Sequence, residues 1–160
     1  MKKEKKIIPD EYKREIILSH YENPINKINE EEWKEQKKEY FCEKTSSASC
    51  IDNFCIYMKI GNNVIKDIKF SGEGCAISTS SIDIMSNYLK NKKIDDGLKL
   101  INNYLDMVYG KNVNKDTIGD LISFENIYKQ VNRIKCASIG IEGMKKIIIE
   151  ISKKNKRNKN

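Results

Sequence analysis

In the stretch Ser71-Gly72-Glu73-Gly74-Cys75-Ala76-Ile77-Ser78, a predicted β-strand ends and a predicted helix begins. Apolar residues alternate over 64–70, which is typical of a strand, and recur at helical spacing over 77–89. The two glycines permit the tight turn between these elements. Cys75 is therefore expected at a helix N-terminus, where unpaired N–H groups and the helix dipole stabilise a thiolate. The thiolate is the form of cysteine that binds metal or attacks sulfur.

The pattern on either side of this junction predicts one helix, then strands, then helices. Two further strands are expected at 39–45 and 53–60, and Gly61-Asn62-Asn63 is typical of a hairpin turn into the strand at 64–70. The order predicts an α+β fold with a small antiparallel three-stranded sheet packed against helices on one side. The remaining predicted helices span 10–21, 94–109 and 121–130, and a last helix runs from about Cys136 to Ser152.

Length and charge indicate one domain over 1–160, with basic frayed tails at about 1–8 and 153–160. Residues 1–6 carry a net charge of +3 and residues 153–160 a net charge of +5, so the body holds almost none of the total of +7. We therefore expect no nucleic-acid partner. The chain has neither the run of ~18–20 apolar residues of a membrane helix nor a secretory signal. A cytoplasmic location with no membrane contact, in which thiols stay reduced, is expected.

The chain has five cysteines, and an odd number of thiols in a reducing compartment favours metal or redox chemistry. No two of them form a CxxC pair, which argues against zinc ribbons and fingers. Cys50 lies in a predicted loop with Asp52 two residues later, while Cys75 and Cys136 open predicted helices. Three thiolates and one carboxylate would make a tetrahedral set suited to zinc or to one corner of an iron–sulfur cluster. The alternative is that these cysteines are small buried hydrophobes.

The other metal-binding side chains are expected to play no part in such a site. Cys42 and Cys55 are interpreted as bystanders, since Cys55 alternates with the apolar side chains of its strand and should point away from the buried face. The single histidine, His20, is interpreted as a hydrogen-bonding residue at the end of a helix.

Four segments resemble the SufU/IscU (NifU N-terminal-like) family of iron–sulfur cluster assembly proteins, and the likeness extends from about Tyr12 to Lys153. The most specific are those around Cys75 and Cys136. The four segments are His20-Tyr21-Glu22-Asn23-Pro24, Cys50-Ile51-Asp52, Gly72-Glu73-Gly74-Cys75-Ala76-Ile77-Ser78 and Arg133-Ile134-Lys135-Cys136-Ala137.

Within that family the chain looks like SufU rather than IscU. IscU-type members have histidine where this chain has Lys135, and they carry a chaperone-binding Leu-Pro-Pro-Val-Lys segment with no counterpart here. The long stretch between Cys75 and Cys136 also matches a SufU-type insertion. Ile51 departs from the family's usual Pro-Thr-Cys-Gly-Asp pattern, and a β-branched residue disfavours the positive φ that glycine allows.

The resemblance implies that Cys50, Asp52, Cys75 and Cys136 bind Zn²⁺ and that Cys50 accepts persulfide sulfur from a SufS-type cysteine desulfurase. Arg133 is expected to stabilise the freed thiolate or persulfide by its positive charge. The alternative interpretation is that Arg133 is an ordinary exposed arginine with no role at the site. A second hypothesis makes the protein a scaffold on which a transient iron–sulfur cluster is built and passed to apo iron–sulfur proteins or downstream assembly factors. A third is a structural zinc protein with an adaptor role.

Overall fold

The computed structural model describes residues 7–46 and 52–158, so Cys50 and Ile51 lie outside the described residues. Three strands form an antiparallel sheet in the order β1 (Phe41–Ser46), β2 (Asn53–Gly61) and β3 (Val64–Glu73). The predicted hairpin is confirmed: Asn62 and Asn63 have φ of 53° and 60°, the two positive values of a type I′ turn.

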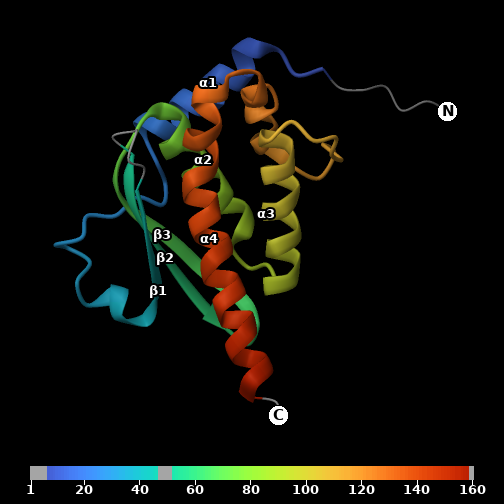
Figure 1. Cartoon of the computed structure of the whole chain (residues 1–160). Coiled ribbons are helices and arrows are strands. Elements are labelled where there is room, and N and C mark those ends of the chain that lie inside the picture. The colour runs from blue at the N-terminus through green and yellow to red at the C-terminus, as the bar shows by residue number, and fades with distance from the viewer. Residues whose placement is uncertain (1–6, 47–51, 159–160) are drawn as a thin grey trace.

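Helices cover one face of this sheet, which confirms the predicted α+β fold (Figure 1). Long helix α4 packs beside α2 and α3 and also contacts β1 and β2, while α1 crosses one end and packs on α2. The helices are α1 (Asp10–Glu22), α2 (Ala76–Leu89), α3 (Ile94–Val108) and α4 (Val131–Asn158), with 3-10 turns η1 (Gln36–Glu39), η2 (Gly119–Phe124) and η3 (Ile127–Lys129).

The core lies between the sheet and these helices. Alternate residues of β2, among them Phe54 and Ile56, are completely buried against it, as the sequence pattern requires. Helices α2 and α4 approach very closely: a Cβ added at Gly140 would lie 2.2 Å from Cγ1 of Ile82. This close approach fixes α4 against α2 just after Cys136.

The opposite face of the sheet is also partly covered, which the alternation in β2 does not reveal. Tyr57 is only 4% exposed, although it points away from the helical layer. Trp33 covers it, with ring centroids 5.6 Å apart, and Tyr40 packs edge-on against Trp33 at 4.5 Å. These aromatic rings come from the connection between α1 and β1, so the burial depends on residues distant in sequence.

Two predictions for the C-terminal third were wrong in detail. Helix α4 begins at Val131, so Cys136 lies in its second turn and does not open it, and the helix continues to Asn158 rather than ending at Ser152. The helical stretch expected at 121–130 is a pair of 3-10 turns.

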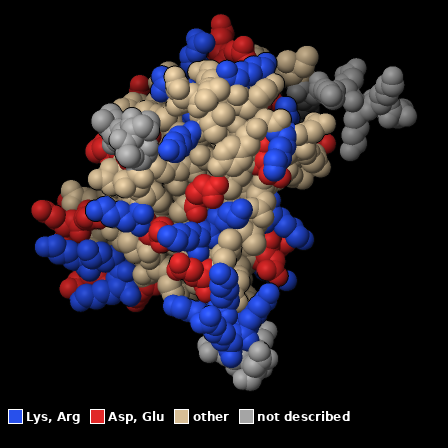
Figure 2. Space-filling view, in the orientation of Figure 1, with Lys and Arg blue, Asp and Glu red and all other residues tan. Residues whose placement is uncertain are grey.

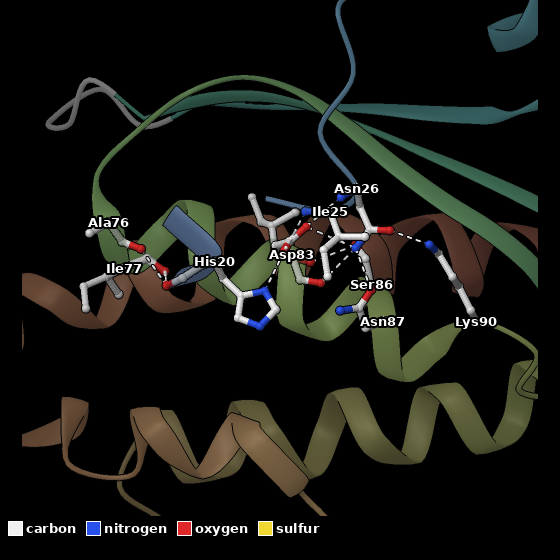
Figure 3. A network of polar contacts seen from close by, with 11 residues as sticks. His20, Ile25, Asn26, Ala76, Ile77, Asp83, Ser86, Asn87 and Lys90 are labelled. Atoms are coloured by element: carbon white, nitrogen blue, oxygen red, sulfur yellow. Dashed lines mark hydrogen bonds and ion pairs between the residues drawn. The ribbon is translucent and has the colours of Figure 1, made fainter. Parts of the chain in front are cut away.

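A buried polar network ties the segment after α1 to α2 (Figure 3). Asp83 is completely buried and accepts hydrogen bonds from the backbone N–H groups of Ile25 at 3.1 Å and Asn26 at 2.8 Å. Nδ1 of His20 lies 2.5 Å from Oδ2 of the same carboxylate group, the oxygen that also accepts from Ile25. The interpretation of His20 as a hydrogen-bonding residue at the end of α1 is therefore confirmed.

Among the residues that the structure describes, no helix combines the length and the apolar character needed to cross a membrane.

Candidate metal centre

Three of the four side chains singled out from the sequence meet at one end of the fold. One oxygen of Asp52 and the sulfur atoms of Cys75 and Cys136 all lie within 4.8 Å of one another. Asp52 directly precedes β2, Cys75 caps α2, and Cys136 lies in the second turn of α4. Cys50, the fourth, lies outside the described residues.

Cys75 occupies the expected position at the start of α2. Its Sγ accepts a hydrogen bond of 3.4 Å from the backbone N–H of Ser78, which makes it the side-chain cap of the helix. The backbone N–H of Cys75 donates to Oδ1 of Asp52 at 2.9 Å. The capped end of α2 therefore holds both the sulfur and the carboxylate.

The two glycines before Cys75 allow this close arrangement. Gly72 has φ of +111°, and a Cβ there would lie 2.0 Å from the carbonyl oxygen of Asn53. A Cβ at Gly74 would lie 2.6 Å from Oδ1 of Asp52 and 2.6 Å from Oγ of Ser78. Larger residues at either position would push β3 or the cap away from Asp52.

Two members of the cluster, Asp52 and Cys136, are hidden from solvent, and this burial affects the Cys136 thiol. Asp52 is 2% exposed and Cys136 is 4% exposed. Burial raises the pKa of the Cys136 thiol, and hydrogen bonding and charge repulsion from Cys75 and Asp52 raise this pKa further. Three groups that repel one another as anions favour a cation among them, because a bound metal ion reverses this effect.

The donor set fits zinc. Zn–S bonds of about 2.3 Å in a tetrahedron place sulfur atoms roughly 3.8 Å apart, and the three donor atoms here all lie within 4.8 Å of one another. Thiolates with one carboxylate oxygen are zinc ligands, and thiolates also hold iron–sulfur clusters. Within the described residues, the backbone N–H of Cys75 and Oγ of Ser78 both donate to Oδ1 of Asp52, and neither donates to Oδ2.

The two bystander cysteines lie away from this cluster. Cys42 on β1 pairs with Tyr57, and Cys55 on β2 pairs with Lys44, so both thiols share the face of Tyr57. Burial, followed by the neighbouring Cys55, raises the pKa of the Cys42 thiol. Their place in the sheet agrees with the interpretation that they do not take part in the cluster.

Arg133 lies in the exposed first turn of α4, one helical turn before Cys136. Residues at this spacing share one side of a helix. Arg133 and Cys136 therefore lie on the same side of α4. Lys135 is also exposed.

Figure 2 shows how charge is distributed over one face of the molecule. Basic and acidic residues alternate over its lower half. Ion pairs of the protein include Lys146 with Glu43 and Lys59 with Glu39, each at 3.0 Å. Much of the upper part of this face is uncharged.

Sequence reasoning missed one residue of the centre. Ser78 is completely buried, and its Oγ donates to Oδ1 of Asp52 at 3.0 Å. The sequence does contain one indication of this role. Ser78 lies three residues after the helix cap Cys75, and side chains at this spacing commonly interact at the start of a helix.

Comparison with known proteins places the chain in a family. Residues 11–158 match the NifU-like N-terminal domain family. The chain is 30% identical over 136 residues to the zinc-dependent sulfurtransferase SufU of Bacillus subtilis (strain 168), covering 83% of this chain and 86% of that protein. It is 27% identical over 111 residues to the iron–sulfur cluster assembly scaffold protein IscU of Thermotoga maritima, covering 69% of this chain and 78% of that protein.

Solved structures show the same fold. A proposed iron–sulfur cluster assembly scaffold protein for the SUF system from Fervidobacterium islandicum AW-1 aligns with a TM-score of 0.71 and 25% identity, over 81% of this chain and 90% of that chain. The N-terminal part of a NifU-like protein from Brucella abortus aligns with a TM-score of 0.72 and 17% identity, over 91% of this chain and 96% of that chain. With its fold and the match over nearly all of its length, the chain belongs to the NifU-like N-terminal domain family, the family of the SufU and IscU iron–sulfur cluster assembly proteins.

Proposed function

We propose that this protein is a SufU-type sulfur acceptor, in which zinc is held by Cys50, Asp52, Cys75 and Cys136 and Cys50 receives persulfide sulfur from a cysteine desulfurase. The observation that carries the proposal is the meeting of Asp52, Cys75 and Cys136 within 4.8 Å, although they come from three distant parts of the chain. Cys50 is separated from Asp52 by one residue, and a tetrahedral zinc site needs a fourth ligand.

Two features favour the SufU type over the IscU type. Lys135, rather than a histidine, directly precedes Cys136, and its exposed side chain leaves the ligand set as three thiolates and one carboxylate. The connection between α3 and α4 is long and contains η2 and η3, in keeping with a SufU-type insertion. The zinc-dependent sulfurtransferase of Bacillus subtilis, a relative at 30% identity, supports the same assignment.

The proposed reaction is a thiol–persulfide exchange. The Cys50 thiolate attacks the outer sulfur of the persulfide on the desulfurase, a new S–S bond forms on Cys50, and the desulfurase cysteine leaves as a thiolate. Zinc, when bound, lowers the pKa of the Cys50 thiol and keeps the thiolate from reacting until the partner docks. Arg133 supplies positive charge on the Cys136 side of α4 that stabilises the anionic sulfur.

The test compares two cysteine variants in the presence of the desulfurase. Cys50→Ala is expected to retain most of the metal through the other three ligands but to fail to stimulate the desulfurase. Cys42→Ala, which removes a thiol on the opposite face of the sheet, should behave as the wild type. Undiminished stimulation by the Cys50 variant would refute the sulfur-acceptor role.

The second candidate is a scaffold that holds an iron–sulfur cluster and transfers it to apo iron–sulfur proteins. The donor set supports it, because a hard carboxylate among soft thiolates weakens the hold on a cluster and so assists release. Anaerobic reconstitution with iron and sulfide separates the two candidates. A cluster that passes to an apo-acceptor supports the scaffold, whereas retention of zinc and no transfer supports the sulfur acceptor.

A further inference from the structure

Ser78 contacts two of the proposed metal ligands at once. It lies in the first turn of α2 and is completely buried. Its Oγ lies 3.0 Å from Oδ1 of Asp52 and 3.4 Å from Sγ of Cys75, and its backbone N–H donates to the same sulfur at 3.4 Å. A single side chain therefore connects a ligand from the loop before β2 with a ligand at the start of α2.

The hydroxyl proton of Ser78 has a preferred acceptor. Oγ of Ser78 lies 3.0 Å from Oδ1 of Asp52, 3.1 Å from the carbonyl oxygen of Cys75 and 3.4 Å from Sγ of Cys75. A carboxylate oxygen is the strongest acceptor of the three, and it is also the nearest. The backbone N–H of Cys75 donates to the same oxygen at 2.9 Å. Two donors on Oδ1 restrict the rotation of the carboxylate group, and this also fixes the position of its second oxygen, Oδ2.

The neighbouring serines of α2 behave differently. Ser81 is also completely buried, yet its hydroxyl donates to the backbone carbonyl of Ser78 at 2.9 Å. Ser80 and Ser86 likewise donate to carbonyls of their own helix, those of Ala76 and Ile82. Hydrogen bonds of this kind are common for serine within helices. They do not involve the side chain of a proposed metal ligand. Ser81 is thus a matched control for Ser78.

We propose that Ser78 is a positioning residue of the metal centre, whose hydroxyl holds the Asp52 carboxylate in its ligand orientation before the metal binds. The proposal rests on the proposed zinc centre and adds a residue that acts through Asp52 without touching the metal. Outer partners of metal ligands act in this way, because they fix the ligand's rotation and lower the entropy lost on binding. Gly74 belongs to the same arrangement, since any Cβ there would displace both Asp52 and Ser78.

The first measurement is zinc affinity, by competition with a chromophoric chelator on purified protein. Ser78→Ala should weaken zinc binding about 10- to 100-fold, whereas Ser81→Ala should leave the affinity within about twofold of the wild type. The melting temperature of each zinc-free variant is measured alongside. An unchanged zinc affinity in Ser78→Ala, with a lowered melting temperature alone, would show that the hydroxyl has only a structural role and would overturn the proposal.

A double-mutant cycle tests whether Ser78 acts through Asp52. In an Asp52→Ala background, in which three cysteines remain to bind zinc, adding Ser78→Ala should change the affinity by less than about twofold. A full additional loss there would contradict the proposed route. Zinc affinity is measured without the desulfurase. If the sulfur-acceptor role is wrong, the wild-type protein will not stimulate the desulfurase, but the zinc affinities of the variants will still test the role of Ser78.

Discussion

Nδ1 of His20 and Oδ2 of Asp83 lie 2.5 Å apart, and the Asp83 carboxylate is completely buried. The same carboxylate accepts the backbone N–H groups of Ile25 and Asn26 and the side-chain amide of Asn26. A buried carboxylate is tolerated when donors surround it in this way. The segment that ends α1 is therefore held on α2, the helix that begins with Cys75.

Replacing Asp83 is expected to destabilise the protein strongly. Asp83→Ala leaves the donors of His20, Ile25 and Asn26 without their acceptor, at an expected cost of about 3–5 kcal/mol in the free energy of unfolding. Urea denaturation measures this change. Asp116→Ala, which removes an exposed carboxylate, serves as the control and should alter stability by less than about 0.5 kcal/mol. Equal stability of the two variants would contradict the role given to Asp83.

Tyr104 should make stability fall at alkaline pH. Its hydroxyl donates to the carbonyl oxygen of Ala137 at 2.7 Å, and complete burial raises its pKa above the usual value. Because the phenol ionises in the unfolded chain near pH ~10 but not in the folded protein, ionisation favours the unfolded state above that pH. The free energy of unfolding should then fall by up to about 1.4 kcal/mol per pH unit from this group, with no contribution below about pH 9.

Denaturation between about pH 8 and pH 11 checks this effect. Tyr104→Phe should cost about 1 kcal/mol at neutral pH through the lost hydrogen bond, and its stability should fall less steeply above pH ~10 than that of the wild type. Tyr12→Phe, at a half-exposed position, is the control for the loss of a phenol hydroxyl and should change the stability at neutral pH by less than about 0.5 kcal/mol. An unchanged alkaline slope in Tyr104→Phe would refute the assignment.

Gly74 should be essential to the metal centre. Gly74→Ala would place a Cβ 2.6 Å from Oδ1 of Asp52 and 2.4 Å from Cζ of Phe54, so the cap of α2 has to shift. We expect a loss of about 1–3 kcal/mol in stability and a zinc affinity lower by at least about tenfold. Gly61→Ala is the control, because its nearest contact, Cε of Lys66, would be an ordinary 3.6 Å away. Wild-type zinc affinity in the Gly74 variant would count against the geometry of the cluster.

Arg133 should affect sulfur transfer without affecting metal binding. Arg133→Ala is expected to lower stimulation of the desulfurase about tenfold, because one charge-assisted hydrogen bond to the sulfur is lost. The zinc content should be unchanged. Lys135→Ala removes an exposed cation two residues away and should have little effect. The prediction is checked by desulfurase assays with each variant in parallel with metal analysis, and equal behaviour of the two variants would show that Arg133 is an ordinary surface arginine.

Much of the fold is predictable because its signals are local. The hairpin follows from Gly61-Asn62-Asn63, and the strand-to-helix junction at Cys75 follows from a change in hydrophobic period. The start of α4 was misplaced because Val131 is exposed, and the residues around it show no apolar period that would mark a helix. Burial of Tyr57 by Trp33 depends on a contact between distant segments, which alternation in one strand does not contain.

The candidate site was predictable as a set of residue types, and less so as a geometry. The chemistry and positions of Cys75, Asp52 and Cys136 predict a shared metal site, and the structure brings these three together. The contribution of Ser78 was missed because its partner Asp52 is 26 residues away in sequence, and serine within a helix usually bonds to its own backbone. The same holds for Asp83, whose donors lie 57 to 63 residues away.

The most direct test of the metal centre is the zinc X-ray absorption spectrum of the purified protein. The account predicts a four-coordinate ion with three sulfur ligands at about 2.3 Å and one oxygen at about 2.0 Å. In Cys136→Ser the spectrum should show one sulfur fewer, and in Cys42→Ser it should be unchanged. A zinc environment that keeps all its sulfur ligands in Cys136→Ser, or that loses one in Cys42→Ser, would contradict the account.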